Sequence, residues 1–141
     1  MRAAADSSVT IAALLSDHPA HAAAAAALAR CDTTIAHVAA ETYSVLTRLP
    51  APHRADAGTA VGVLEQRTAP TYAALAAGSY AQALGRLAAA GISGGATYDG
   101  LIALTALEHE LRLVSRDGRA ARTYRALGID FELLAAAAPE P

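Results

Sequence analysis

Four acidic residues occupy comparable places along the chain. Asp6 and Asp117 each follow an expected strand, Glu41 lies in the first turn of the helix after the second strand, and Asp99 lies in the first turn of a helix after a Gly-rich loop. Carboxylates gathered at an apolar rim raise one another's pKa unless a cation compensates. Hard oxygen ligands suit Mg²⁺, with Mn²⁺ as an alternative. Such a site fits in-line displacement at a phosphodiester by an activated water. For any single acid, a solvated surface position is the commoner alternative.

The elements that would position these acids alternate along the chain. Apolar β-branched runs and helix signals predict strands at residues 3–5, 33–38, 69–72, 111–115 and 129–134, and helices at 20–30, 39–49, 54–67, 79–90, 98–109 and 118–127. Alternation of this kind predicts parallel strands with helices on both faces. Ligands of such sheets bind outside the carboxyl ends of the strands, where the strand order reverses. The strand at residues 3–5 rests on this pattern, because its alanines favour strands poorly.

Composition limits the class of protein. The 141 residues suit one domain spanning 1–141, with residues from about 135 to 141 expected to fray. The chain has 40 Ala, eleven Arg and no Lys, and its net charge of −2 excludes a strongly basic nucleic-acid coat. A lone Cys31 excludes an intramolecular disulfide and a cysteine zinc cluster. Without a membrane-spanning stretch or a signal-peptide pattern near the N-terminus, a cytoplasmic, reducing setting is expected.

Arginines are concentrated after Asp117. Five of them fall within 14 residues, and the last four recur at every third position: Arg112, Arg116, Arg119, Arg122 and Arg125. Arginine forks match phosphate oxygens, so Arg116, Arg119 and Arg122 are candidate RNA-binding residues, with a solvated helix face as the equally weighted alternative.

Two other features have a functional and a simpler interpretation. His18 and His21 have metal-ligand spacing, but no third ligand is in view, and a surface pair is favoured. Tyr98 could stack on an RNA base, although a core role is favoured.

The sequence around the acids resembles a known family. Asp6-Ser7-Ser8-Val9, the block from Glu41 to Leu49, Tyr98-Asp99-Gly100-Leu101-Ile102-Ala103, and Leu113-Val114-Ser115-Arg116-Asp117 resemble the four signature blocks of PIN-domain ribonucleases. The resemblance is strongest to VapC-type toxins of bacterial toxin–antitoxin pairs, and it covers nearly the whole chain. Two departures are the alanines before Asp6 and Gly100, where a larger residue is more usual.

This resemblance implies a fold and an activity. The implied fold is a three-layer α/β/α domain around a five-stranded parallel sheet. The implied activity is that of a Mg²⁺-dependent endoribonuclease toxin that cuts a specific RNA, commonly tRNA or rRNA. An antitoxin and a second copy of the chain would be its protein partners. Asp6, Glu41, Asp99 and Asp117 match the family's catalytic and metal-binding acids, and Ser8 and Ser115 match supporting hydroxyl positions.

Two other functions remain open at this level. One is a PIN-type nuclease in RNA processing without a toxin role, and the other is a non-catalytic module that binds nucleic acid or protein. The intact set of four acids favours the catalytic interpretations.

Overall fold

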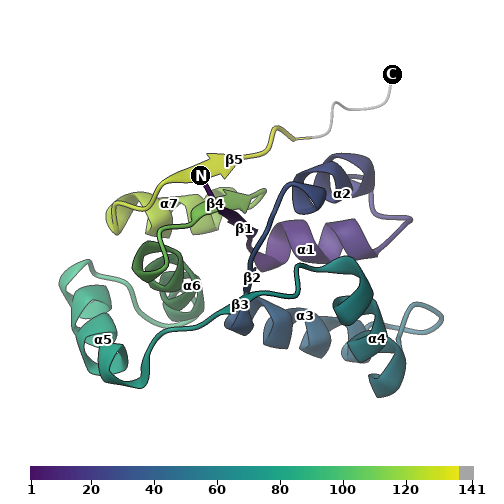
Figure 1. The fold of residues 1–141 in the computed structure, drawn as a ribbon, viewed down its shortest axis with the longest axis horizontal. Coiled ribbons are helices and arrows are strands. Elements are labelled where there is room, and N and C mark those ends of the chain that lie inside the picture. The colour runs from purple at the N-terminus through teal and green to yellow at the C-terminus, as the bar shows by residue number, and fades with distance from the viewer. Residues whose placement is uncertain (137–141) are drawn as a thin grey trace.

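The computed structural model describes residues 1–136 and contains short parallel strands covered by helices (Figure 1). Its strands are β1 (Ala3–Ala5), β2 (Thr34–Ile35), β3 (Tyr72–Ala73), β4 (Arg112–Ser115) and β5 (Phe131–Leu133). Its helices are α1 (Ser7–Leu14), α2 (His21–Ala29), α3 (Ala36–Arg48), α4 (Ala57–Arg67), the 3₁₀ turn η1 (Ala77–Ser79), α5 (Tyr80–Ala89), α6 (Ala96–Glu108) and α7 (Gly118–Ala126). The frayed tail expected at about 135–141 falls almost entirely outside the described residues.

The expected single five-stranded sheet is wrong for this chain. The described strands form two parallel sheets, one of three strands in the order β1-β4-β5 and one of β2 and β3. The sheets meet where the backbone N–H groups of Asp32 and Thr33 both donate to the Ala3 carbonyl, at 3.1 and 3.3 Å. The pairing stops there because β2 is only two residues long and the chain enters α3 at Ala36. A regular ladder between β1 and β2 therefore does not form.

The alanine strand β1 is confirmed, and its alternation separates two layers of core. Ala4 and Leu113 face a cluster that includes residues of α6 and α7, whereas Ala5 and Val114 face a cluster with α1 and α2. Successive side chains of a strand point to opposite faces, so the three-stranded sheet is covered on both sides (Figure 1). The α/β class with helices on both faces is thus confirmed.

Small side chains explain how α1 and α2 pack beside β1. Ala12, Ala13, Ala24 and Ala27 on these helices are each at most 1 % exposed. Alanine adds little volume, so the helices approach each other and the strand closely. Close packing of this kind contributes dispersion contacts where large apolar side chains are missing.

Several boundaries differ from those expected. The strand predicted at 33–38 ends at Ile35, and His37 and Val38 belong to α3, so Glu41 lies in the second turn of that helix instead of the first. Helix α2 starts at His21, after a turn, and Asp17 does not cap it.

Gly100 has a packing role in α6. A Cβ atom at this position would lie 2.4 Å from Cδ2 of Leu87 on α5. The missing side chain therefore lets α5 pack directly against the turn of α6 that carries Asp99, which explains the departure from the family pattern.

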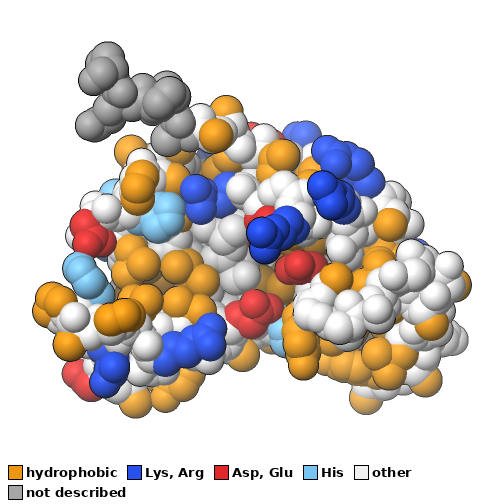
Figure 2. Space-filling view, turned by 180° about the vertical axis from the view of Figure 1, so that it is seen from behind, with side chains coloured by type: hydrophobic (Ala, Val, Ile, Leu, Met, Phe, Trp, Pro, Cys, Tyr) orange, Lys and Arg blue, Asp and Glu red, His pale blue; other side chains and the backbone are white. Residues whose placement is uncertain are grey.

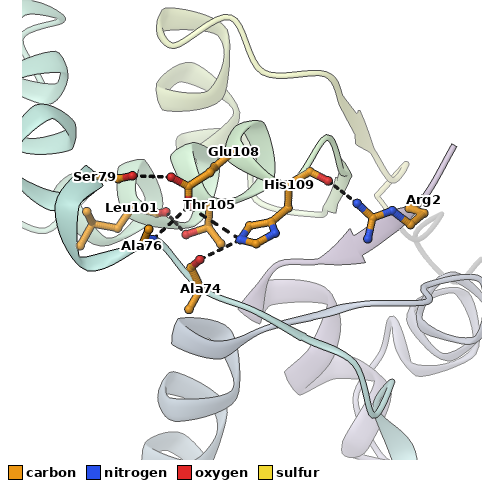
Figure 3. Close-up of polar contacts among 8 residues, drawn as sticks. All are labelled: Arg2, Ala74, Ala76, Ser79, Leu101, Thr105, Glu108 and His109. Carbon is orange, nitrogen blue, oxygen red and sulfur yellow. Dashed lines mark hydrogen bonds and ion pairs between the residues drawn. The ribbon is translucent and has the colours of Figure 1, made fainter.

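Polar contacts fasten the segment before α5 to the C-terminal end of α6 (Figure 3). Glu108 accepts hydrogen bonds from the Ser79 hydroxyl and from the Ala76 N–H, and His109 Nε2 lies 2.8 Å from the Ala74 carbonyl. Arg2 donates to the His109 carbonyl at 2.6 Å, which adds the N-terminus to the group. These contacts fix the far end of α6 and so help to set where its first turn lies.

Within residues 1–136, no helix has both the length and the apolar character needed to cross a bilayer.

Candidate active site

Asp6 is held rigidly at the carboxyl end of β1. It is 2 % exposed and caps α1, with Oδ1 accepting from the backbone N–H groups of Ser8 and Val9 at 3.0 and 3.3 Å. The Ser8 hydroxyl also donates to Oδ1 at 2.5 Å, and the Tyr124 hydroxyl donates to Oδ2 at 2.8 Å. Four donors on one buried carboxylate stabilise its charge and fix its orientation.

Asp117 lies at the carboxyl end of the neighbouring strand, β4, and caps α7. Its Oδ1 accepts from the Arg119 N–H at 2.9 Å, and its own N–H donates to the Ser115 hydroxyl at 3.1 Å. The Arg116 N–H donates to the Ser8 hydroxyl at 2.9 Å. Of the two predicted supporting residues, Ser8 therefore connects the ends of β1 and β4, because it contacts both Asp6 and the Arg116 N–H. Ser115 makes a local contact that fixes the backbone at Asp117.

Asp99 lies in the first turn of α6. Burial raises the pKa of Asp99 to about 6, with further contributions from the negative charges of Asp6, Asp117 and Glu41 in that order. A shift that includes all three charges requires all three side chains to be near. The structure thus brings together the four acids that the sequence singled out.

Glu41 completes the group from the second turn of α3. Its Oε2 accepts from the Ser7 hydroxyl at 3.4 Å. Its Oε1 is buried and lies 2.9 Å from Nε2 of His37, but the two atoms do not meet the angles of a hydrogen bond, and within residues 1–136 neither has another partner. A buried carboxylate oxygen without a donor is costly and would be satisfied by a cation or by water.

The donor set fits a hard divalent cation. Carboxylate oxygens are the ligands that Mg²⁺ and Mn²⁺ prefer, and the mutual repulsion at Asp99 would be relieved by positive charge. No three His, Cys, Asp or Glu side chains in the described part of the chain are already arranged around one point as a metal site. In the described residues the four acids are therefore near one another without forming a complete set of metal ligands.

The arginines after Asp117 divide into two groups. Arg112 lies 3.5 Å from Asp130, and the Arg125 guanidinium lies 5.4 Å from the centre of the Phe131 ring. Three others form no ion pair within residues 1–136, namely Arg116, Arg119 and Arg122. Acidic side chains with arginines beside them lie near the middle of one face of the molecule (Figure 2). The three candidate RNA-binding arginines therefore remain available for phosphates.

The histidine pair gains no support as a metal site. His18 Nδ1 accepts from the Ala20 N–H at 3.0 Å, and His21 Nδ1 lies 3.2 Å from the Ala12 carbonyl. Both rings are thus engaged by the backbone around the turn before α2.

Comparison with known proteins decides the family. Residues 3–126 match the model of the PIN domain. The chain belongs to the PIN-domain family. It is 44% identical over 129 residues to Ribonuclease VapC40 of Mycobacterium tuberculosis. The aligned residues cover 92% of this chain and 96% of the relative. It is also 43% identical over 128 residues to Ribonuclease VapC27 of the same species, covering 89% and 92%. The predicted resemblance to VapC-type members of the PIN-domain family is confirmed.

Two residues near the PIN-domain acids were missed as parts of the site by the sequence analysis. Tyr124 sits on the inner side of α7, four residues after the buried Ala120, and donates to Asp6. The spacing from Ala120 was the available signal, since residues four apart lie on one side of a helix. His37 was assigned to a strand, so its place one turn before Glu41 on the same side of α3 could not be seen.

Replacing Tyr124 with Phe is expected to lower the free energy of unfolding by about 1.5–3 kcal/mol, because a buried hydrogen bond to a charged acceptor is lost. Burial and the nearby Asp6 charge raise the pKa of Tyr124, so the phenol stays protonated and donates. Urea unfolding measures the change. Tyr43→Phe, at a half-exposed position on α3, is the control and should change stability by less than about 0.5 kcal/mol. Equal stability of Tyr124→Phe and the wild type would contradict the assigned contact.

Replacing Asp99 with Asn is expected to stabilise the metal-free protein above pH 7. The pKa of Asp99 in the folded protein, about 6, exceeds the ordinary aspartate pKa of 3.8, so the unfolded chain ionises first and stability falls as pH rises through this window. Asn has no charge and avoids this decrease in stability. After allowance for solvent screening, we expect its free energy of unfolding to exceed that of the wild type by about 1 kcal/mol, or about 3 °C in Tm. Thermal melts in EDTA at pH 4 and pH 8 test this, with the exposed Glu65→Gln as control. A variant no more stable than the wild type at pH 8 would show that the acids do not repel.

Proposed function

We propose that this protein is a Mg²⁺-dependent endoribonuclease that acts as the toxin of a type II toxin–antitoxin pair. The observation that carries the proposal is the convergence of Asp6, Glu41 and Asp117 on the half-buried Asp99, whose pKa is raised by burial and then by their negative charges. A second support is the similarity to relatives named Ribonuclease VapC40 and Ribonuclease VapC27. We expect tRNA or rRNA to be the substrate class.

The four acids would share two tasks in the proposed reaction. Asp6, Asp99 and Asp117 would hold the cation, which when bound supplies positive charge to activate water and to stabilise the leaving oxygen. Asp6 is fixed by its four donors and would set the position of the site. Within residues 1–136, the buried Oε1 of Glu41 lies beside His37 but accepts no hydrogen bond, so Glu41 would be either a fourth ligand or the group that accepts a hydrogen bond from the attacking water and orients it.

Arginine side chains would hold the substrate. Arg116 follows β4 directly beside Asp117, and Arg119 and Arg122 continue along α7 on its exposed side. Their guanidinium groups can each bind phosphate oxygens of a single-stranded RNA and compensate for repulsion between its backbone and the acids. These contacts are independent of sequence, so the choice of RNA must come from other parts of the surface.

The purified protein tests the proposed activity with tRNA and rRNA as probes. We expect discrete cleavage products in Mg²⁺, loss of cleavage in EDTA, and recovery with Mn²⁺. Cleavage of equal rate in EDTA and in Mg²⁺ would overturn the metal-dependent mechanism. No cleavage of any RNA in Mg²⁺ or Mn²⁺ would favour a non-catalytic binding module.

Expression in a bacterial host tests the toxin role separately. We expect the protein to act in the cytoplasm of the host and to arrest its growth. Co-expression of a small protein encoded beside this chain, acting as the antitoxin, should relieve the arrest. RNA cleavage in vitro without growth arrest would instead favour a nuclease of RNA processing. Size-exclusion chromatography would show whether a second copy of the chain is also a partner.

A further inference from the structure

An exposed aromatic pair lies beside the four acids. Tyr98 is on the first turn of α6, directly before Asp99, and is 55% exposed. Its ring is parallel to that of His37 on α3, with an interplanar angle of 5° and ring centres 5.5 Å apart. The sequence analysis favoured a core role for Tyr98, and this exposure shows that the prediction was wrong.

His37 anchors the pair to the site. Its side chain is 31% exposed, and its Nε2 lies 2.9 Å from Oε1 of Glu41. His37 and Glu41 are four residues apart on one side of α3, so the imidazole is held next to the carboxylate. The aromatic pair is thus attached to two of the four acids, through Glu41 on α3 and through Asp99 on α6.

We propose that the Tyr98–His37 pair is a stacking platform for an unpaired nucleobase of the RNA next to the cleaved phosphate. The inference rests on the proposed nuclease function and assigns to the same site the part that binds a base. Proteins bind single-stranded RNA by stacking its bases on aromatic side chains. His37 stacks against one face of the Tyr98 ring. Tyr98 is also largely exposed, so a base can stack on the part of the ring that His37 does not cover.

The arrangement separates base and backbone binding. Arg116, Arg119 and Arg122 offer positive charge to phosphates from β4 and α7, whereas the stack is carried by α3 and α6. A nucleotide bound with its phosphate at the acids could place its base, or that of its neighbour, on Tyr98. A base inside a duplex has no free face, so the platform selects unpaired segments such as loops.

Fluorescence tests the platform directly, because the chain has no Trp and Tyr98→Trp introduces a single reporter. The probes are a 12-nucleotide oligo(A) and an abasic 12-mer of the same charge, both added in EDTA. We expect oligo(A) to quench the emission of Tyr98→Trp and the abasic probe to leave it unchanged. Quenching by both probes alike, or by neither, would overturn the proposal.

Tyr80→Trp is the matched control. Tyr80 is 46% exposed and follows Ser79, which contacts Glu108 at the last turn of α6. Asp99 is nine residues earlier, about 14 Å along the helix. Emission of Tyr80→Trp should not respond to either probe. An equal response at both positions would mean that the bases bind non-specifically and would contradict the platform.

Affinity measurements separate stacking from folding. We expect Tyr98→Ala to bind oligo(A) about 5- to 100-fold more weakly, Tyr98→Phe to stay within about twofold of the wild type, and all three proteins to bind the abasic probe equally. Wild-type affinity of Tyr98→Ala for oligo(A), or equal losses on both probes, would overturn the platform. If Tyr98→Ala still binds oligo(A) normally while RNA is cleaved in Mg²⁺ and not in EDTA, this inference alone fails. If RNA is not cleaved under any condition, the proposed function fails instead.

Discussion

Replacing Asp99 with Asn should reduce single-turnover cleavage of RNA in Mg²⁺ on the order of 10³-fold or more. Asp99 is the acid on which the charges of Asp6, Glu41 and Asp117 act together. Asn has nearly the same shape but no charge, so it weakens the proposed hold on the cation and leaves substrate contacts elsewhere intact. Losses of this size are typical when a group acts mainly in the transition state.

The same variant separates chemistry from folding. Because Asp99→Asn is expected to stabilise the metal-free protein at pH 8, its inactivity could not be attributed to a damaged fold. Glu65→Gln removes an exposed carboxylate from α4 and should cleave RNA at the wild-type rate. An Asp99→Asn protein with more than about a tenth of wild-type activity would contradict the role assigned to the acid.

Replacing Arg116, Arg119 and Arg122 together with Gln should weaken binding of single-stranded RNA about 100-fold at 0.1 M salt. Each phosphate contact to a single strand contributes about 0.7 to the slope of log affinity against log salt, so three lost contacts reduce that slope by about 2. Gln is polar and uncharged and retains the side chain as far as Cδ, so the substitution removes the positive charge and the guanidinium fork without adding an apolar surface. Binding to oligo(A) in EDTA across a salt series measures both quantities.

Arginines from the same stretch supply the control. Arg112 and Arg125 already interact with Asp130 and with the Phe131 ring, so Arg112→Gln with Arg125→Gln should change RNA affinity by less than about threefold. The comparison removes similar numbers of charges from one region of the chain. Equal losses in the two variants would indicate a general charge effect and would contradict a specific path for the RNA backbone.

Much of the fold could be predicted from the order of the elements. β1 illustrates this, because Ala3–Ala5 has little strand propensity and was assigned only because the alternation required a strand before Asp6. The structure confirms it, since β4 pairs with it in register and both of its faces are covered. Tertiary pairing can override a weak local preference when the neighbouring strand and helices are strong.

The differences have local causes. The run Thr33-Thr34-Ile35 favours a strand, but nothing in the sequence marks Ile35 as its end, since Ala36 and His37 fit either state. Because the strand is so short, two predictions were wrong: the single five-stranded sheet, and the place of Glu41 in the first turn of its helix. The contact of Tyr124 with Asp6 joins residues 118 positions apart. Helix spacing can place Tyr124 on the buried side of α7, but it cannot identify the residue that Tyr124 contacts.

Binding of Mn²⁺, followed by electron paramagnetic resonance in the absence of RNA, is the most direct test of the claim that four separate acids form one metal site. We expect saturable binding by the wild type that is weakened at least about tenfold in each of Asp6→Asn, Glu41→Gln, Asp99→Asn and Asp117→Asn. Glu65→Gln and Glu108→Gln, which lie outside the group, should bind as the wild type does. Wild-type affinity for Mn²⁺ in all four site variants would contradict the account.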